Sequence, residues 1–142
     1  MELADVNILV NAYRADLPGH RACRDLVLGM TSSPLPYGVS DHILSGFLRV
    51  VTHPRVLDPP TPIDEALAFA EALRSQPNAV TVTPGRRHWK IFTNLCDSAR
   101  PKGNLVPDAY LAALAIEWGC EWVSADRDFS RFPGLKWCLV KT

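Results

Sequence analysis

Hydrophobic and polar positions follow two patterns along the chain, and these patterns predict its elements. Short apolar or β-branched runs bounded by Gly, Pro or polar residues are typical of buried strands. These runs lie at Glu2–Val6, Leu35–Ser40, Ala79–Thr83, Cys120–Ala125 and Lys136–Val140. Apolar residues spaced three and four apart predict helices. These stretches are Asn7–Ala15, His20–Gly29, Asp41–Thr52, Thr61–Ser75, Arg86–Ala99 and Val106–Trp118. Thr61 is the predicted N-cap of the fourth of these helices. Strands alternating with helices favour an α/β fold, with a parallel sheet covered by helices on both faces.

Acidic residues recur where predicted strands and helices meet. Asp5 lies near the end of the first strand, Asp108 opens the Val106–Trp118 helix, and Asp126 follows Cys120–Ala125, with Asp128 two residues further on. The carboxyl ends of parallel strands lie at one edge of the sheet, where ligands bind in such folds. We therefore expect these carboxylates to lie close together.

Clustered carboxylates repel one another unless a cation neutralises them. An all-oxygen set favours Mg²⁺ or Mn²⁺, and such ions commonly support phosphoryl chemistry. Each acid also has a simpler interpretation. Asp108 can be a first-turn residue favoured by the helix dipole, and Asp126 and Asp128 can be turn formers. Asp5, flanked by apolar residues, is harder to explain in that way, and Asn7 either caps the following helix or orients Asp5 or a metal-bound water.

Length and composition predict one ordinary domain over residues 1–142, with 47% hydrophobic and 21% charged residues. No apolar run reaches the roughly 18 residues of a membrane helix, and no export signal is visible, so we expect a cytoplasmic protein that does not contact the membrane. The formal net charge is zero. Any contact with nucleic acid must therefore come from a local patch.

Cysteine and histidine patterns argue against a zinc site. The four cysteines are widely spaced without a CxxC pair, and the four histidines lack HxxxH or HExxH spacing. We expect Cys23, Cys96, Cys120 and Cys138 to be buried free thiols.

Basic residues gather in three short segments. Arg100 and Lys102 precede the helix that carries Asp108, Arg49 lies in LRVVTHPR, and GRRHWK contains Trp89. Lys and Arg neutralise phosphates, so Arg100 and Lys102, with Arg49, are the candidate RNA contacts. Trp89 is spaced three residues from Phe92, which predicts a core position more strongly than a base-stacking one.

Three segments, DVNILVNAYR, GFLRVVTHPRV and PDAYLAALAIEWGCEWVSADRDFSRFPGL, resemble the VapC toxins, the PIN-domain ribonucleases of bacterial toxin–antitoxin modules. The segments LRVVTHPR and RFPGLKW look like a branch abundant in mycobacteria. The resemblance covers nearly the whole chain. It implies a three-layer PIN fold with four or five parallel strands, and a Mg²⁺- or Mn²⁺-dependent endoribonuclease that cuts structured RNA such as tRNA or rRNA and so inhibits translation. It also implies a homodimer and a VapB antitoxin partner.

The resemblance assigns roles to residues of this chain. Asp5, Asp108 and Asp126 would be catalytic metal ligands, Asp128 an auxiliary carboxylate, and Asn7 and Ser124 polar supports.

One position departs from the family pattern. Many PIN nucleases carry a Glu on the helix after the second strand, and the register of FLRVVT places Gly46 there. Asp41, five residues earlier, is expected to point elsewhere as a first-turn acid with Ser40 as N-cap. The departure keeps open a weakly active or non-catalytic module that binds RNA or an antitoxin. A haloacid-dehalogenase-type phosphatase is disfavoured, because Asn7 stands where its second Asp is needed.

Overall fold

The computed structural model describes all 142 residues and contains one five-stranded parallel sheet. Its strands are β1 (Glu2–Ala4), β2 (Tyr37–Val39), β3 (Ala79–Thr81), β4 (Glu121–Ser124) and β5 (Trp137–Leu139). Their order across the sheet is β3-β2-β1-β4-β5. Every neighbouring pair is parallel, and Leu3 of β1 pairs with Gly38 on one side and Trp122 on the other. The α/β architecture and the parallel sheet are thus as predicted, with strands two or three residues shorter.

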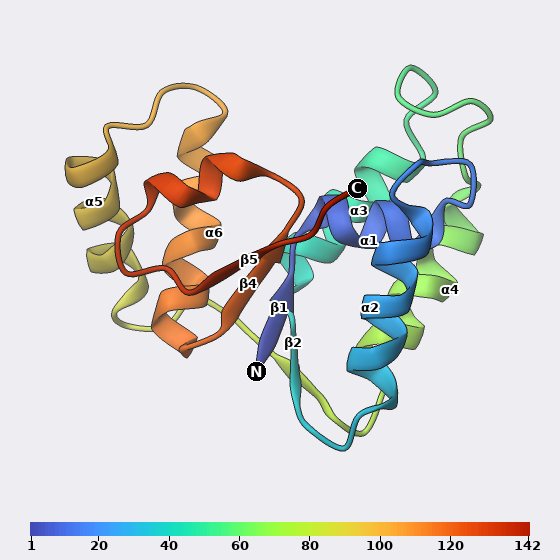
Figure 1. Cartoon of the computed structure of the whole chain (residues 1–142), viewed down its shortest axis with the longest axis horizontal. Coiled ribbons are helices and arrows are strands. Elements are labelled where there is room, and N and C mark those ends of the chain that lie inside the picture. Colours follow the sequence, from blue (N-terminus) through green and yellow to red (C-terminus); the bar gives the residue numbers. More distant parts are fainter.

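Helices cover both faces of this sheet. They are α1 (Val6–Tyr13), α2 (His20–Ser32), α3 (Asp41–Val51), α4 (Ile63–Arg74), α5 (His88–Ala99) and α6 (Leu105–Trp118). A 3₁₀ helix, η1 (Arg127–Arg131), was not predicted. In Figure 1, α1 to α4 lie on one side of the sheet, and α5 and α6 lie on the other. The fold is therefore the three-layer arrangement expected from the sequence.

The order of the strands creates a switch point between β1 and β4. The chain moves outward from β1 to β2 and β3, and then returns across the sheet to β4 on the other side of β1. Ligands of such open sheets bind outside the carboxyl ends of the two strands at the switch. The backbone N–H of Asp5 donates to the carbonyl oxygen of Val123 at 2.8 Å, so the Asp5 backbone extends this pairing at the end of β1.

The core consists of residues that the sheet and its helices bury together. Trp122, Phe47 and Phe129 are the largest fully buried side chains. The α6 helix buries six residues, four of which are alanines, and these small side chains let the helix approach the sheet closely. No helix combines the length and the apolar character needed to cross a membrane.

Three local predictions are wrong. Trp89 contacts Phe92 with 5.5 Å between ring centroids, but its side chain is 68% exposed and lies outside the core. Cys138 is exposed, although all four thiols are free and Cys23 and Cys120 are buried. The N-cap of α4 is Pro62, without a side-chain capping bond. Thr61 does not cap the helix because its hydroxyl accepts a hydrogen bond from Arg14 at 3.3 Å.

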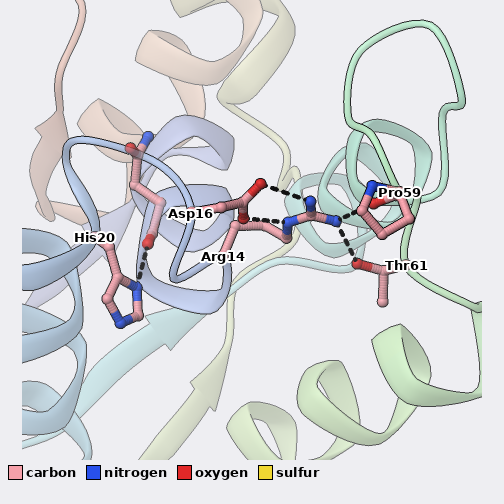
Figure 2. Close-up of polar contacts among 6 residues, drawn as sticks. Arg14, Asp16, His20, Pro59 and Thr61 are labelled. Atoms are coloured by element: carbon pink, nitrogen blue, oxygen red, sulfur yellow. Dashed lines mark hydrogen bonds and ion pairs between the residues drawn. The ribbon is translucent and has the colours of Figure 1, made fainter.

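Arg14 ties the end of α1 to the segment before α4 (Figure 2). Its guanidinium makes two hydrogen bonds to the Asp16 carboxylate, at 2.7 and 2.8 Å. It also donates to the Pro59 carbonyl oxygen at 2.6 Å and to the Thr61 hydroxyl. The residue is only 8% exposed. Charge-assisted bonds from a buried guanidinium fix two segments that are far apart in the sequence.

Replacing Arg14 by methionine is expected to lower the free energy of unfolding by about 2 kcal/mol, because charged hydrogen bonds are lost and the buried Thr61 hydroxyl loses its donor. Urea denaturation measures this change. Arg24→Met is the matched control, since Arg24 is exposed and lies 3.8 Å from Asp25; its effect should stay within about 0.5 kcal/mol. Equal effects of the two variants would show that the Arg14 bonds add nothing.

Candidate functional site

Asp5 lies at the junction of β1 and α1 and is 6% exposed. Its Oδ1 accepts a hydrogen bond from the backbone N–H of Val6 at 2.7 Å. Its Oδ2 accepts from the Ser124 hydroxyl at 2.6 Å and from the Asn7 side-chain amide at 2.8 Å. The carboxylate therefore has one fixed orientation, with unused lone pairs still available to a cation.

Asn7 and Ser124 join the ends of β1 and β4. The Asn7 amide nitrogen also donates to the Ser124 hydroxyl oxygen at 3.2 Å, and its Oδ1 accepts from the backbone N–H of Ala125 at 3.1 Å. The Ser124 hydroxyl oxygen accepts from the backbone N–H of Asp126 at 3.0 Å. Of the two interpretations of Asn7, this geometry favours the one in which it orients Asp5.

Asp126 and Asp128 begin the η1 helix. Asp126 is the N-cap of η1, and its Oδ1 accepts from the backbone N–H of Asp128 at 2.8 Å. Asp126 therefore does form a turn through its Oδ1, as one of its two interpretations predicted. Its Oδ2 stays available to a cation. The Asp128 carboxylate lies 3.4 Å from the Arg131 guanidinium, so part of its charge is already neutralised.

Asp108 lies in the first turn of α6, where the charges of the other acids affect its pKa. Burial, followed by the negative charges of Asp5, Asp126 and Asp128, together raise its pKa from 3.8 to about 6. Burial also raises the pKa of Asp5, and the Ser124 hydrogen bond opposes that rise. Four carboxylates from three segments therefore share one electrostatic environment, and we call them the acidic site.

No basic side chain neutralises the three main acids. The four salt bridges of the structure involve none of Asp5, Asp108 and Asp126. No three His, Cys, Asp or Glu side chains converge closely enough to hold a metal ion alone. The donor set consists entirely of oxygens, and it suits an ion that accepts few protein ligands and keeps several waters. Mg²⁺ has this preference.

Gly46 lies on α3 where this helix meets the start of α1. A Cβ atom at Gly46 would lie 2.9 Å from Cγ2 of Val6, the residue whose N–H binds Asp5. Close packing of α1 and α3 therefore leaves no room for a side chain. Asp41 does not replace the missing acid, because it is exposed and its Oδ1 accepts from Arg74 of α4 at 2.8 Å. This is the first-turn position predicted for Asp41, although Ser40 makes no capping bond.

Gly46→Ala is expected to lower the free energy of unfolding by about 1–2 kcal/mol, because the added methyl group overpacks Val6. Gly29→Ala is the matched control: this helical glycine has no atom within 4 Å of its Cβ position. Alanine there should raise stability by about 0.5–1 kcal/mol. Chemical denaturation of both variants measures the difference, and a stabilising Gly46→Ala would refute the close-packing argument.

The predicted RNA contacts lie on the surface. Arg100 and Lys102 are exposed in the loop between α5 and α6, and Arg49 is exposed in the last turn of α3. Arg100 ends α5 in a left-handed conformation with φ of 49°. The structure puts the Arg100–Lys102 loop directly before the helix of Asp108. Their contact with RNA stays a prediction.

Sequence reasoning did not single out His42 and Tyr110. Their ring centroids lie 5.7 Å apart, beside the first turn of α6. Each residue sits on a different helix, so no local pattern could pair them. The only available signal was that Tyr110 follows Asp108 by two residues.

The PIN domain family model matches residues 3–135. The ribonuclease VapC43 of Mycobacterium tuberculosis is 43% identical over 137 residues, covering 96% of this chain and 93% of the relative. VapC25 of the same organism is 40% identical over 136 residues, covering 96% of each chain.

Two solved structures have the same fold. The VapBC2 structure from Rickettsia felis, bound to a DNA fragment from its promoter, has a TM-score of 0.68 at 14% identity and covers 96% of each chain. Mycobacterium tuberculosis VapC20, described as a sarcin–ricin loop cleaving toxin, has a TM-score of 0.62 at 19% identity, covering 94% of this chain and 97% of that one.

Proposed function

The chain belongs to the PIN-domain family, among the VapC endoribonucleases of toxin–antitoxin modules, and on that premise we propose that it hydrolyses RNA with a divalent cation held at the acidic site. One observation carries the proposal. The pKa of Asp108 is raised to about 6 by burial and by three neighbouring carboxylates, and no basic side chain offsets the charge of Asp5, Asp108 or Asp126. Such an arrangement is stable when a cation completes it.

Asp5, Asp108 and Asp126 would hold the cation, with Asp128 as an auxiliary carboxylate. Mg²⁺ and Mn²⁺ suit the all-oxygen donor set. A bound ion of this kind polarises a phosphate oxygen and favours ionisation of a coordinated water. Because the carboxylates do not form a complete metal site by themselves, water and substrate phosphate would complete the coordination shell.

Neighbouring residues would set the orientation and the protonation of the acids. Ser124 and Asn7 hold Asp5 in one orientation. The Ser124 bond also favours the charged form of Asp5, since it opposes the rise in pKa that burial causes. Asp108, with a pKa of about 6, is mostly ionised at pH 7.5. The cation binds the ionised carboxylates, so we expect hydrolysis to weaken at acidic pH, where protons compete with the cation for them.

The wider role follows from the relatives. VapC20 cleaves the sarcin–ricin loop and VapBC2 is a toxin–antitoxin complex, so we propose a structured RNA substrate, either tRNA or rRNA, whose cleavage inhibits translation. A VapB antitoxin would bind the chain, and the chain would form a homodimer. Helices α2 and α3 are the proposed antitoxin site, which would take a helix of the antitoxin. A complex in which neither helix is buried would remove this last assignment.

Incubation of total RNA with the purified chain tests the function. Discrete new RNA ends are expected with Mn²⁺ and none with EDTA. The alternative is a binding module without catalytic activity, which Gly46 at the usual Glu position favours. A folded chain that binds RNA or VapB but yields no products with any divalent ion would establish that alternative.

A further inference from the structure

A pocket of about 260 Å³ lies between α3, α5 and α6. Five residues line it: His42, Phe92, Val106, Pro107 and Tyr110. Apart from the His42 ring and the Tyr110 hydroxyl, these side chains are apolar. We call it the aromatic pocket. It is large enough for one flat ring system and too small for a helix or an extended peptide.

Aromatic rings continue from the pocket to the outer surface of α5. Phe92 lies 5.6 Å from Tyr110 between ring centroids, and Trp89 lies 5.5 Å from Phe92. Trp89 is 68% exposed. An indole ring left in solvent beside two other rings offers an open face for stacking.

The aromatic pocket adjoins the acidic site. Val106, Pro107 and Tyr110 belong to the first turns of α6, the same turns that carry Asp108. His42 comes from the first turn of α3. A ligand in the pocket would therefore lie at the same end of α6 as a phosphate held at the acids.

Exposed cations occur on α5, which contributes Phe92 to the aromatic pocket, and in the loop that leads into α6, which contributes Val106. Arg100 and Lys102 lie in the loop before α6, and Lys90 follows Trp89 on α5; all three are exposed and take part in none of the salt bridges. Flat rings bordered by free positive charge complement a chain that alternates bases and phosphates. An apolar peptide segment would match the rings but not the charge around them.

We propose that the aromatic pocket takes a single unpaired base of the RNA, next to the phosphate that is cut, and that Trp89 stacks on a neighbouring base. This inference rests on the proposed ribonuclease function. The base would stack against the pocket rings, and the His42 ring and Tyr110 hydroxyl can bond to base edges. The substrate would then need an unpaired nucleotide at the cleavage position.

Fluorescence anisotropy in EDTA tests the proposal without cleavage. The probes are a labelled single-stranded RNA heptamer, the same heptamer with an abasic central nucleotide, and the heptamer paired in a duplex. The variants are Trp89→Leu, which removes the exposed ring, and Val106→Trp, which fills the pocket from a position 38% exposed. Trp118→Leu is the matched control, because Trp118 is 39% exposed at the opposite end of α6.

We expect wild type and Trp118→Leu to bind the intact heptamer with equal affinity. Trp89→Leu and Val106→Trp should each bind it at least about 5-fold more weakly, the lower range for one base stack. The wild-type chain should also bind the abasic heptamer and the duplex at least about 5-fold more weakly than the intact heptamer. Val106→Trp should not discriminate the abasic heptamer from the intact one.

Equal binding of the intact and abasic heptamers by wild type would overturn the base pocket, even if metal-dependent cleavage of total RNA were observed. Unchanged RNA binding by Val106→Trp together with lost binding of VapB would also overturn it, in favour of a protein ligand. No binding of any RNA, with no cleavage, would remove the inference together with the proposed function.

Discussion

Replacing Asp5 by asparagine is expected to reduce RNA cleavage with Mn²⁺ by at least about 100-fold, because the central anionic ligand is lost from the acidic site. The fold should remain. The asparagine Oδ1 can still accept from the backbone N–H of Val6, and its amide nitrogen can donate to the Ser124 hydroxyl oxygen in place of the bond that Asp5 Oδ2 accepts. Initial rates on one defined RNA measure the effect, and circular dichroism checks the fold.

Asp41→Asn is the matched control for this substitution. Asp41 is exposed and bound to Arg74, and it does not contribute to the raised pKa of Asp108. Its cleavage rate should stay within about twofold of wild type. A folded Asp5→Asn chain with wild-type cleavage would rule out Asp5 as a metal ligand.

Asp108→Asn is expected to have opposite effects on stability and on activity. The pKa of Asp108 in the folded chain is about 6, above its ordinary value of 3.8, so its charged form is disfavoured by folding. At pH 8 without metal, the neutral amide removes this cost. The full difference between these two pKa values corresponds to about 3 kcal/mol of folding free energy. Because Asp108 is partly exposed, solvent screening reduces this cost to about 1–2 kcal/mol. Cleavage should fall at least about 10-fold.

The sign of the stability effect depends on pH. As pH falls through about 6, the folded wild-type chain takes up a proton on Asp108 and the advantage of the variant shrinks. Below the ordinary pKa it is gone, because folded and unfolded chains are then both protonated. Urea denaturation in EDTA at pH 8 and pH 4 measures this. A variant less stable than wild type at pH 8 would contradict the repulsion argument.

The sequence allowed the layers and the order of the elements to be predicted, because periodicity reports which side of an element is buried. Boundaries were less accurate, since strands of three or four residues carry little pattern. Thr61 was wrongly predicted as an N-cap, because its hydroxyl accepts a hydrogen bond from Arg14 and makes none to the helix. That long-range bond leaves no local signal. The η1 helix was missed because aspartates such as Asp126 and Asp128 favour a simple turn as well as a short 3₁₀ helix.

The acids of the candidate site were visible because each follows a strand or opens a helix. The bridge between Asn7 and Ser124 was not visible, since 117 residues separate them. Spacing correctly paired Trp89 with Phe92 but did not show which side of α5 faces solvent. The aromatic pocket combines three helices, so it becomes apparent only in the folded chain. Roles in metal binding and RNA contact stay predictions for all these residues.

Calorimetric titration of Mn²⁺ into the metal-free chain at pH 7.5 tests most directly whether the acids form one cation site. Wild type and Asp41→Asn should bind the ion with the same affinity, and Asp5→Asn should bind it at least about 10-fold more weakly, as expected when one charged ligand is lost. Equal affinity in all three chains would place the ion elsewhere and contradict the account.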